Sequence, residues 1–263
     1  MALNLFRYPL SGKIKPEQEK FLNSAEKRVL HRDKTKIQTY RWAGPGKRVL
    51  LMHGWQSNSS RWSSMIPELR KNGYDIMAMD APGHGASGGV LFDAYRYALF
   101  LEVVEAHFAP EIIVAHSVGA MSALYYKSHF KSEGIRKIIA LGPPNRLVDL
   151  TAVFVRILGF SERTRKAYDR QFMDHFDHDQ EYYNTADFVK KIRIPGAVIH
   201  DRNDPLNKYR DGVAIAENWK DAKLYTTNRL GHSLQSPEVY DIVVSELNSL
   251  SNEPTKERTN ADA

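Results

Sequence analysis

An α/β fold is predicted, because short apolar runs that resemble strands alternate with segments that resemble helices as far as residue 144. Turns that contain glycine or proline punctuate this alternation. One strand-like run ends directly in a serine that precedes a helix-like segment. The chain has 263 residues, enough for one large domain with a sizeable hydrophobic core. We therefore expect a single α/β domain over residues 1–263.

The serine at this junction, Ser117, follows the apolar, β-branched run at residues 112–116. A strand that turns this tightly into a helix puts the serine in strained backbone torsions, and bulky neighbours would clash there. The small residues Ala115 and Gly119, two positions to either side of the serine, suit such a turn. A turn of this kind, called a nucleophile elbow, holds a serine hydroxyl clear of the sheet. Ser117 is thus the candidate catalytic nucleophile, with an ordinary turn serine as the alternative.

A second strand-like run, at residues 48–52, ends in His53, Gly54 and Trp55. Acyl-transfer sites stabilise the developing oxyanion with two backbone N–H groups, one after the nucleophile and one from the loop after an earlier strand. Here these groups would be the amides of Val118 and Trp55. Gly54 lets the backbone bend close to a substrate, and we expect His53 to be structural.

Three further polar residues near these turns are expected to have no part in catalysis. Asp80 and His84 lie in a glycine- and proline-rich loop at residues 80–88. We interpret both as residues that shape the loop, because better-placed acids and bases follow downstream. The side chain of His116 is expected to point away from Ser117 and to pack under the turn, with contact to substrate as the alternative.

The segments LLMHGW (50–55), DAPGHGAS (80–87) and AHSVGA (115–120), in this order, resemble the α/β-hydrolase superfamily. The similarity is closest to a broad group of bacterial serine hydrolases that includes small esterases and peptidase-like members. It covers the chain from about residue 37 to about residue 247. The resemblance implies a mostly parallel central sheet with helices on both faces, a small helical cap, and a triad in the chain order Ser, Asp or Glu, His.

The resemblance places the catalytic acid in the loop after a late strand, which here ends near residue 200. Two aspartates follow that point, Asp201 and Asp204. Asp204 has the family's usual offset from the strand end and is the acid that we predict. Asp201 lies nearer to the strand and is expected to brace the loop.

The same resemblance places the base after the final strand, and here His232 follows the run at residues 222–227. His232 would accept the Ser117 proton through one ring nitrogen, while Asp204 would hold the proton of the other. The resemblance thus implies a serine hydrolase that cleaves carboxylic esters of a small-molecule acyl substrate, and small-to-medium esters are expected because pockets of this kind usually accept them. The reaction would pass through an acyl-enzyme intermediate and would need neither a metal nor an organic cofactor.

Other activities stay open at this point. A serine nucleophile also serves in the hydrolysis of C–C bonds, thioesters and peptides, whereas dehalogenases and epoxide hydrolases of this fold use an aspartate. A non-catalytic or slow small-molecule receptor on a hydrolase scaffold is the alternative from a different class. On a helix, His175 and His178 would share a face at a spacing that could bind a metal. A polar helix end is favoured there, because a serine triad needs no metal.

Residues 145–186 interrupt the alternation and show helical periodicity. In the superfamily an insertion at this place forms a cap over the catalytic serine, so we expect a small helical cap here. Four aromatic residues are candidates for lining an apolar acyl pocket, with packing in the core or cap as the equal alternative: Trp55, Phe154, Phe160 and Phe172.

Composition narrows the classes of protein further. The chain contains no cysteine, which excludes disulfides and thiol chemistry. Its net charge of +6 is spread without a basic stripe, which argues against a nucleic-acid partner. No run approaches the ~20 apolar residues of a membrane span. Because the N-terminus also lacks the features of a signal peptide, we expect a cytoplasmic protein without stable membrane insertion.

The two ends of the chain are predicted from their polarity. A polar helix is expected over residues 16–29, within the N-terminal arm. The last helix is expected over residues 237–250, with its apolar residues on one face. The tail at residues 251–263 is polar and is expected to be disordered.

Overall fold

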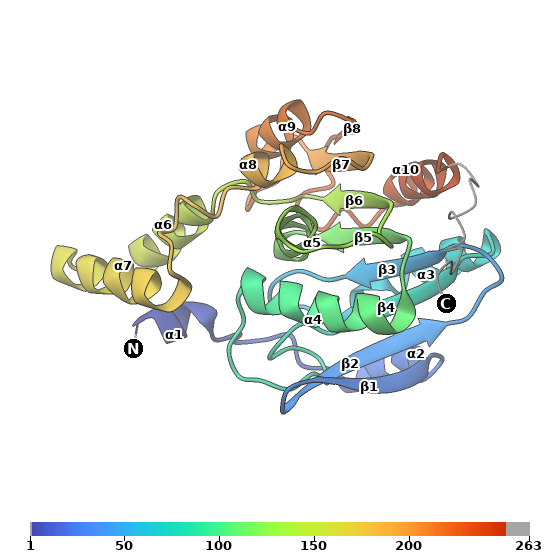
Figure 1. Cartoon of the computed structure of the whole chain (residues 1–263), viewed down its shortest axis with the longest axis horizontal. Coiled ribbons are helices and arrows are strands. Elements are labelled where there is room, and N and C mark those ends of the chain that lie inside the picture. Colours follow the sequence, from blue (N-terminus) through green and yellow to red (C-terminus); the bar gives the residue numbers. More distant parts are fainter. Residues whose placement is uncertain (1, 251–263) are drawn as a thin grey trace, which may run out of the picture.

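A twisted sheet of eight strands forms the centre of the computed structural model, which describes residues 2–250 (Figure 1). The strands follow one another across the sheet in the order β1-β2-β4-β3-β5-β6-β7-β8. Strand β2 is antiparallel to both of its neighbours, and all other neighbouring strands are parallel. The prediction of a mostly parallel α/β sheet is therefore confirmed. The strands are β1 (Glu26–Arg32), β2 (Thr35–Trp42), β3 (Arg48–Met52), β4 (Asp75–Met79), β5 (Ile112–His116), β6 (Lys137–Leu141), β7 (Gly196–Asp201) and β8 (Ala222–Thr227).

Helices cover both faces of the sheet, because successive residues of a strand point to opposite sides. On β3, Leu50 and Met52 belong to one hydrophobic core, and Val49 and Leu51 belong to the other. Strands buried on both faces read as continuous apolar runs, as those at the centre of this sequence do. The first face carries α4 (Ala94–Phe108), α5 (Val118–His129), α8 (Thr185–Val189) and α9 (Tyr209–Asn218). The second carries α2 (Pro16–Leu22), α3 (Met65–Lys71) and α10 (Pro237–Asn248), and a short 3-10 helix (Ser59–Trp62) precedes α3.

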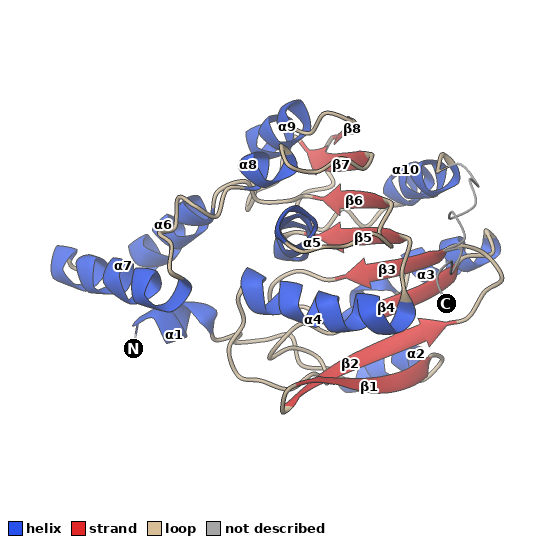
Figure 2. Cartoon of the chain, in the orientation of Figure 1, coloured by secondary structure: helices blue, strands red, loops and turns tan. Residues whose placement is uncertain are grey.

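Three helices lie beyond the carboxyl ends of the parallel strands, where open α/β sheets bind their ligands (Figures 1 and 2). Two of them, α6 (Leu147–Ile157) and α7 (Glu162–Phe176), come from residues 145–186, the segment expected to form a cap. The third is the N-terminal helix α1 (Ala2–Arg7), which packs against α7. Within residues 2–250 no helix combines the length and apolar character that a bilayer crossing requires.

The prediction of a helix over residues 16–29 is wrong in its second half. Helix α2 ends at Leu22, and β1 begins at Glu26. Strand β1 pairs along its whole length with β2, so its conformation is set by a neighbour rather than by its own pattern. Because β1 is an exposed edge strand, its side chains are mostly polar and show no alternation that would indicate a strand. The predicted tail at residues 251–263 lies outside the described residues.

A buried ion pair joins the last helix to the sheet. Lys137, at the start of β6, donates to the carboxylate of Glu246 on α10 and, at 2.7 Å, to its main-chain carbonyl. The Glu246 carboxylate also accepts hydrogen bonds from Lys223 and Tyr225 of β8. Burial raises the pKa of Glu246, but the hydrogen bonds from Lys137, Tyr225 and Lys223 outweigh it and hold the pKa at about 2.

Replacing Glu246 by glutamine tests this pair. At pH 7 the variant Glu246→Gln leaves the Lys137 ammonium buried without a counterion, so we expect a loss of about 3–5 kcal/mol in the free energy of unfolding. The wild-type carboxylate has a lowered pKa, so its contribution is present above the ordinary value of 4.5 and disappears as the pH falls towards 2. Urea unfolding at pH 7 and at pH 3 measures both effects. The exposed Glu217→Gln is the matched control, and equal stability of the two variants at pH 7 would contradict the prediction.

Candidate active site

The turn between β5 and α5 places Ser117 in a sharp elbow. Its torsions are φ 55° and ψ −129°, in the left-handed region that residues with a side chain seldom adopt. The Ser117 amide donates to the carbonyl of Leu141 on the neighbouring strand at 2.9 Å, and its carbonyl accepts from the amide of Ala120 at 2.9 Å. These bonds hold the strained residue in place, and the predicted tight turn is confirmed.

The loop after β3 passes very close to this elbow. A Cβ on Gly119 would lie 2.4 Å from the main-chain oxygen of His53. A Cβ on Gly54 would lie 2.9 Å from the Cβ of Ser117. Glycine is therefore required at both positions. Trp55, whose amide is a predicted oxyanion donor, directly follows Gly54. The close approach brings both loops expected to supply oxyanion donors to the same place.

Three side chains from separate loops form a continuous chain of hydrogen bonds. The Nε2 atom of His232 lies 3.1 Å from the Oγ of Ser117, and its Nδ1 atom lies 2.7 Å from Oδ2 of Asp204. An ionised carboxylate can only accept, so Nδ1 of His232 carries the proton and Nε2 is free to accept from the serine. The structure thus brings together the three residues that the sequence predicts for the triad.

Asp204 is held in its orientation by the backbone that follows it. Its Oδ1 accepts from the amides of Leu206 at 2.8 Å and Asn207 at 3.0 Å, which leaves Oδ2 for His232. Asn207 is fixed in turn, because its Nδ2 donates to the carbonyl of Gly142 at 2.8 Å. Burial raises the pKa of Asp204, but the hydrogen bonds from His232 and the two amides outweigh burial and lower it. The carboxylate is therefore ionised at neutral pH.

A known family matches most of the chain. The sequence profile of the "Alpha/beta hydrolase family" matches residues 49–241. The chain belongs to this family. The resemblance drawn from the sequence motifs is confirmed at the level of the superfamily.

Individual relatives of this α/β hydrolase are distant. A non-heme haloperoxidase of Rhodococcus erythropolis is 31% identical over 118 residues, a match that spans 43% of this chain and 43% of that protein. A bifunctional esterase/perhydrolase of Acinetobacter calcoaceticus is 22% identical over 242 residues, 74% of this chain and 88% of its own. Among solved structures, an esterase of Pyrococcus furiosus superposes with a TM-score of 0.68 at 22% identity and covers 91% of this chain and 97% of its own. That likeness shows the shared fold.

Asp201 of this α/β hydrolase braces the loops, as the sequence predicts. It is fully buried, and its Oδ2 accepts from the Thr227 hydroxyl at 2.8 Å and from the Leu230 amide at 3.0 Å. Its Oδ1 accepts from the amide of Asn203 at 2.9 Å. Asp201 thus ties the loop of Asp204 to the loop that carries His232.

Two contacts to the histidine loop were not foreseen in the sequence. His116 is buried, but the expectation that it packs away from the site is wrong, because it lines the cavity with Ser117 and His232. Its ring packs against His232 with 4.7 Å between centroids, and its Nε2 donates to the His232 carbonyl at 2.8 Å. Arg61 donates to the carbonyl of Ser233 at 2.9 Å. Both residues hold the main chain of the histidine loop, and no local pattern announces either contact.

His53, Asp80 and His84 have the structural roles expected of them. The Nε2 atom of His53 accepts from the Ala81 amide at 2.9 Å, and Nε2 of His84 accepts from the Gln56 amide at 3.0 Å. Burial lowers the pKa of each histidine to about 4, so both rings are neutral and able to accept. Asp80 is buried and accepts hydrogen bonds from the amide and hydroxyl of Ser59, the amide of Ala86 and the hydroxyl of Tyr40. These bonds join the loop after β3 to the loop after β4.

The histidines of α7 and the turn after it pack on aromatic rings. His175 lies edge-on to Phe176 with 4.6 Å between centroids, and His178 stacks on Tyr182 at 3.7 Å. In the part of the chain that the structure describes, no group of three or more His, Cys, Asp or Glu side chains is arranged to hold a metal ion.

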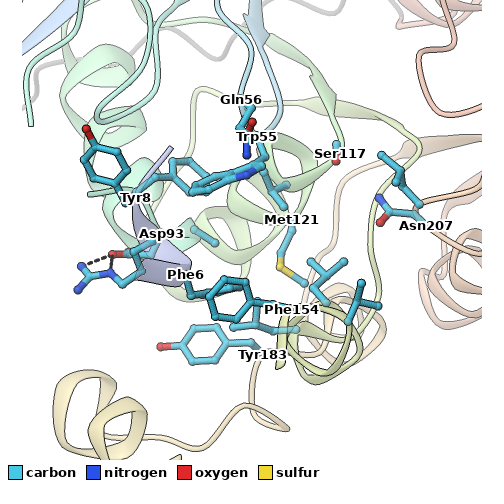
Figure 3. A pocket seen from close by; sticks show the side chains of 18 of the residues that line it. Phe6, Tyr8, Trp55, Gln56, Asp93, Ser117, Met121, Phe154, Tyr183 and Asn207 are labelled. Carbon is cyan, nitrogen blue, oxygen red and sulfur yellow. Dashed lines mark hydrogen bonds and ion pairs between the residues drawn. The ribbon is translucent and has the colours of Figure 1, made fainter. Parts of the chain in front are cut away.

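A cavity of about 630 Å³ opens beside Ser117 and His232 (Figure 3). Of the four aromatic candidates, Trp55, Phe154 and Phe172 line it, and Phe160 packs against Phe154 with 5.8 Å between centroids. Four apolar residues of the N-terminal arm also line this cavity and were missed in the sequence: Leu5, Phe6, Tyr8 and Leu10. The brief apolar stretch at the N-terminus is visible in the sequence, but no neighbouring residues indicate what it packs against.

Substituting Gly119 by alanine tests the close approach at the elbow. The added methyl group would meet a main-chain oxygen, which cannot rotate aside, so we expect a cost near the upper end for overpacking, about 3 kcal/mol. The ~1 kcal/mol that alanine gains over glycine in a helix offsets only part of this loss. Urea unfolding should show a net destabilisation of about 2 kcal/mol.

Gly134→Ala is the control, because its Cβ would meet nothing closer than 3.3 Å and the nearest atom belongs to the Glu105 side chain. We expect it to stay within about 0.5 kcal/mol of wild type. A Gly119→Ala protein as stable as the control would disprove the contact.

Proposed function

We propose that this α/β hydrolase is a serine hydrolase that cleaves carboxylic esters through Ser117, His232 and Asp204. The observation that carries the proposal is the unbroken hydrogen-bond chain from Asp204 through His232 to Ser117. This series of hydrogen bonds ends on Ser117, which lies in an elbow beside a largely apolar cavity. Acyl transfer to serine requires such a setting.

The reaction follows from the positions of these atoms. Ser117 Oγ attacks the ester carbonyl while its proton passes to Nε2 of His232. The carbonyl oxygen becomes an oxyanion, and the amides of Trp55 and Val118 donate to it. The C–O bond to the alcohol then breaks, and the alcohol leaves with the proton from His232. Water repeats the sequence on the acyl-enzyme and releases the carboxylic acid.

Asp204 and its neighbours supply orientation and charge. The carboxylate keeps the proton on Nδ1 of His232 in the resting state and stabilises the imidazolium that forms when Nε2 accepts the serine proton. Asp201, His116 and Arg61 act through the histidine loop and are positioning residues. Relatives named as esterases, among them the protein of Acinetobacter calcoaceticus, support ester hydrolysis as the chemistry.

Hydrolysis of p-nitrophenyl esters from acetate to dodecanoate tests the proposal. We expect the wild type to hydrolyse members of this series. Ser117→Ala should lower kcat by at least about 10³-fold, since the nucleophile is lost. Asp204→Asn should cost about 10³–10⁴-fold, because an amide can hold the wrong tautomer of His232.

Asp221→Asn, an exposed aspartate in the turn before β8, is the matched control and should stay within twofold of wild type. A Ser117→Ala protein that keeps the wild-type rate would overturn the mechanism. A wild type that hydrolyses no ester of the series would overturn ester cleavage. Labelling of Ser117 by a fluorophosphonate then tells whether the serine is activated for another acyl bond.

A further inference from the structure

We propose that the acyl part of the substrate is a long, unbranched apolar chain, and that helix α1 forms one wall of its binding site. This inference rests on the proposed function and names the substrate class that the site takes. Helix α1 lies outside residues 49–241, the part of the chain that matches the family. The proposed acyl site thus combines the matched part of the chain with a helix that lies outside it.

The cavity changes character with distance from Ser117. Ser117, His232 and Asn207 line it at the catalytic end. Beyond them the wall is mostly apolar, although the paired Arg7 and Asp93 and several tyrosines also line it. In Figure 3 the side chain of Met121 lies between Ser117 and the rings of Phe6 and Phe154. A wall that is mostly apolar binds a hydrocarbon in preference to a polar acyl group.

The size of the cavity sets the length of the chain. A water molecule takes about 30 Å³ of liquid, and a methylene group is of similar size, so about 630 Å³ has room for a chain of roughly a dozen carbons or more. A short acyl group would leave most of this apolar volume unfilled. Each methylene that is buried there should raise kcat/KM about fourfold.

Phe6 of α1 contributes directly to this wall. Its ring packs edge-on against Phe154 of α6 with 5.1 Å between centroids, and against Tyr168 of α7 with 6.3 Å. The same residue lines the cavity, so one face of the ring holds the cap helices and another faces the substrate space. Helix α1 therefore acts as a third helix of the cap.

Arg7 fixes α1 to the body of the protein. Its side chain is only 2% exposed, and its guanidinium donates to Oδ2 of Asp93 at 2.6 and 3.2 Å. The carbonyl of Arg7 accepts from the amide of Phe92 at 2.8 Å, and its guanidinium lies 5.4 Å from the centre of the Phe176 ring on α7. The two charges satisfy each other at the edge of the cavity, so this pair adds no free charge to the acyl site.

The rim of the cavity carries apolar side chains that face solvent. Leu5 is 50% exposed and Ile157 is 73% exposed, and both line the same cavity. Exposed apolar groups gathered at one opening mark a surface that a ligand covers. Because this rim is continuous with the cavity, we expect the far end of the same acyl chain to cover it.

Phe6→Ala tests the role of α1 in chain binding. We expect kcat/KM for p-nitrophenyl dodecanoate to fall at least tenfold, because about two methylene groups lose their contact with the wall, while kcat/KM for the acetate changes less than twofold. Phe21→Ala is the matched control, since Phe21 is also partly buried and stacked on an aromatic ring, Trp42, but does not line the cavity. It should change neither ester by more than twofold.

Leu150→Trp tests the same site in the opposite direction. The larger side chain fills part of the cavity, so the preferred ester should become shorter while acetate hydrolysis is kept. Thermal unfolding identifies a variant that fails to fold. The chain-length profile of the other variant then tests the proposal. An unchanged chain-length profile in a folded Phe6→Ala or Leu150→Trp protein would overturn the proposal.

Binding of a fluorescent twelve-carbon fatty acid to Ser117→Ala separates this inference from the proposed function, since binding needs no chemistry. Binding that weakens at least tenfold in the double variant Ser117→Ala, Phe6→Ala supports the chain site even if the wild type hydrolyses no ester. Ester hydrolysis without chain-length preference, together with no binding of the probe, would overturn the chain site and leave the hydrolase mechanism standing.

Discussion

Ser117 is held at a positive φ of 55°, and much of the site is arranged around this one constraint. Such a torsion costs a residue with a side chain about 1–3 kcal/mol and persists only where the surroundings fix it. The hydrogen bond to Leu141 and the glycines at 54 and 119 provide that fixing, since any larger side chain would push the loop after β3 away from the elbow. The strain aims the hydroxyl at the histidine loop instead of into the sheet.

The parallel sheet explains how distant residues reach the same point. Strands β5, β7 and β8 end at one edge, and the loops after them carry Ser117, Asp204 and His232. Proximity alone would leave three loops free to shift. Asp201 ties the loop of Asp204 to the loop of His232, and His116 joins the main chain of His232 to the elbow at Ser117. The hydrogen bonds that position these three residues thus outnumber the two bonds that join them.

The central sheet and the elbow at Ser117 could be predicted from local signals in the sequence, whereas Asp204 and His232 could be predicted only through the resemblance to the α/β hydrolases. The small residues around Ser117 and the apolar runs of the strands are patterns of a few neighbouring residues, so they can be read directly from the sequence. Strand β1 was misread, because an edge strand takes its conformation from its partner. Phe6 was missed for a related reason, since its partners Phe154 and Tyr168 lie about 150 residues away in the chain and only the folded structure joins them.

We therefore infer that chemistry and acyl-chain selection come from different parts of this protein. The proposed reacting groups stand on loops fixed to the sheet, whereas the proposed acyl wall is shared among α1, α6 and α7, beyond the ends of the strands. Helix α1 reaches that wall through Phe6 and is anchored through the buried pair of Arg7 and Asp93. Substitutions in α1 can reshape the cavity without moving Ser117 or His232, because neither residue takes a hydrogen bond from this helix. An N-terminal helix of this kind lets the length of the accepted chain change while the catalytic geometry stays the same.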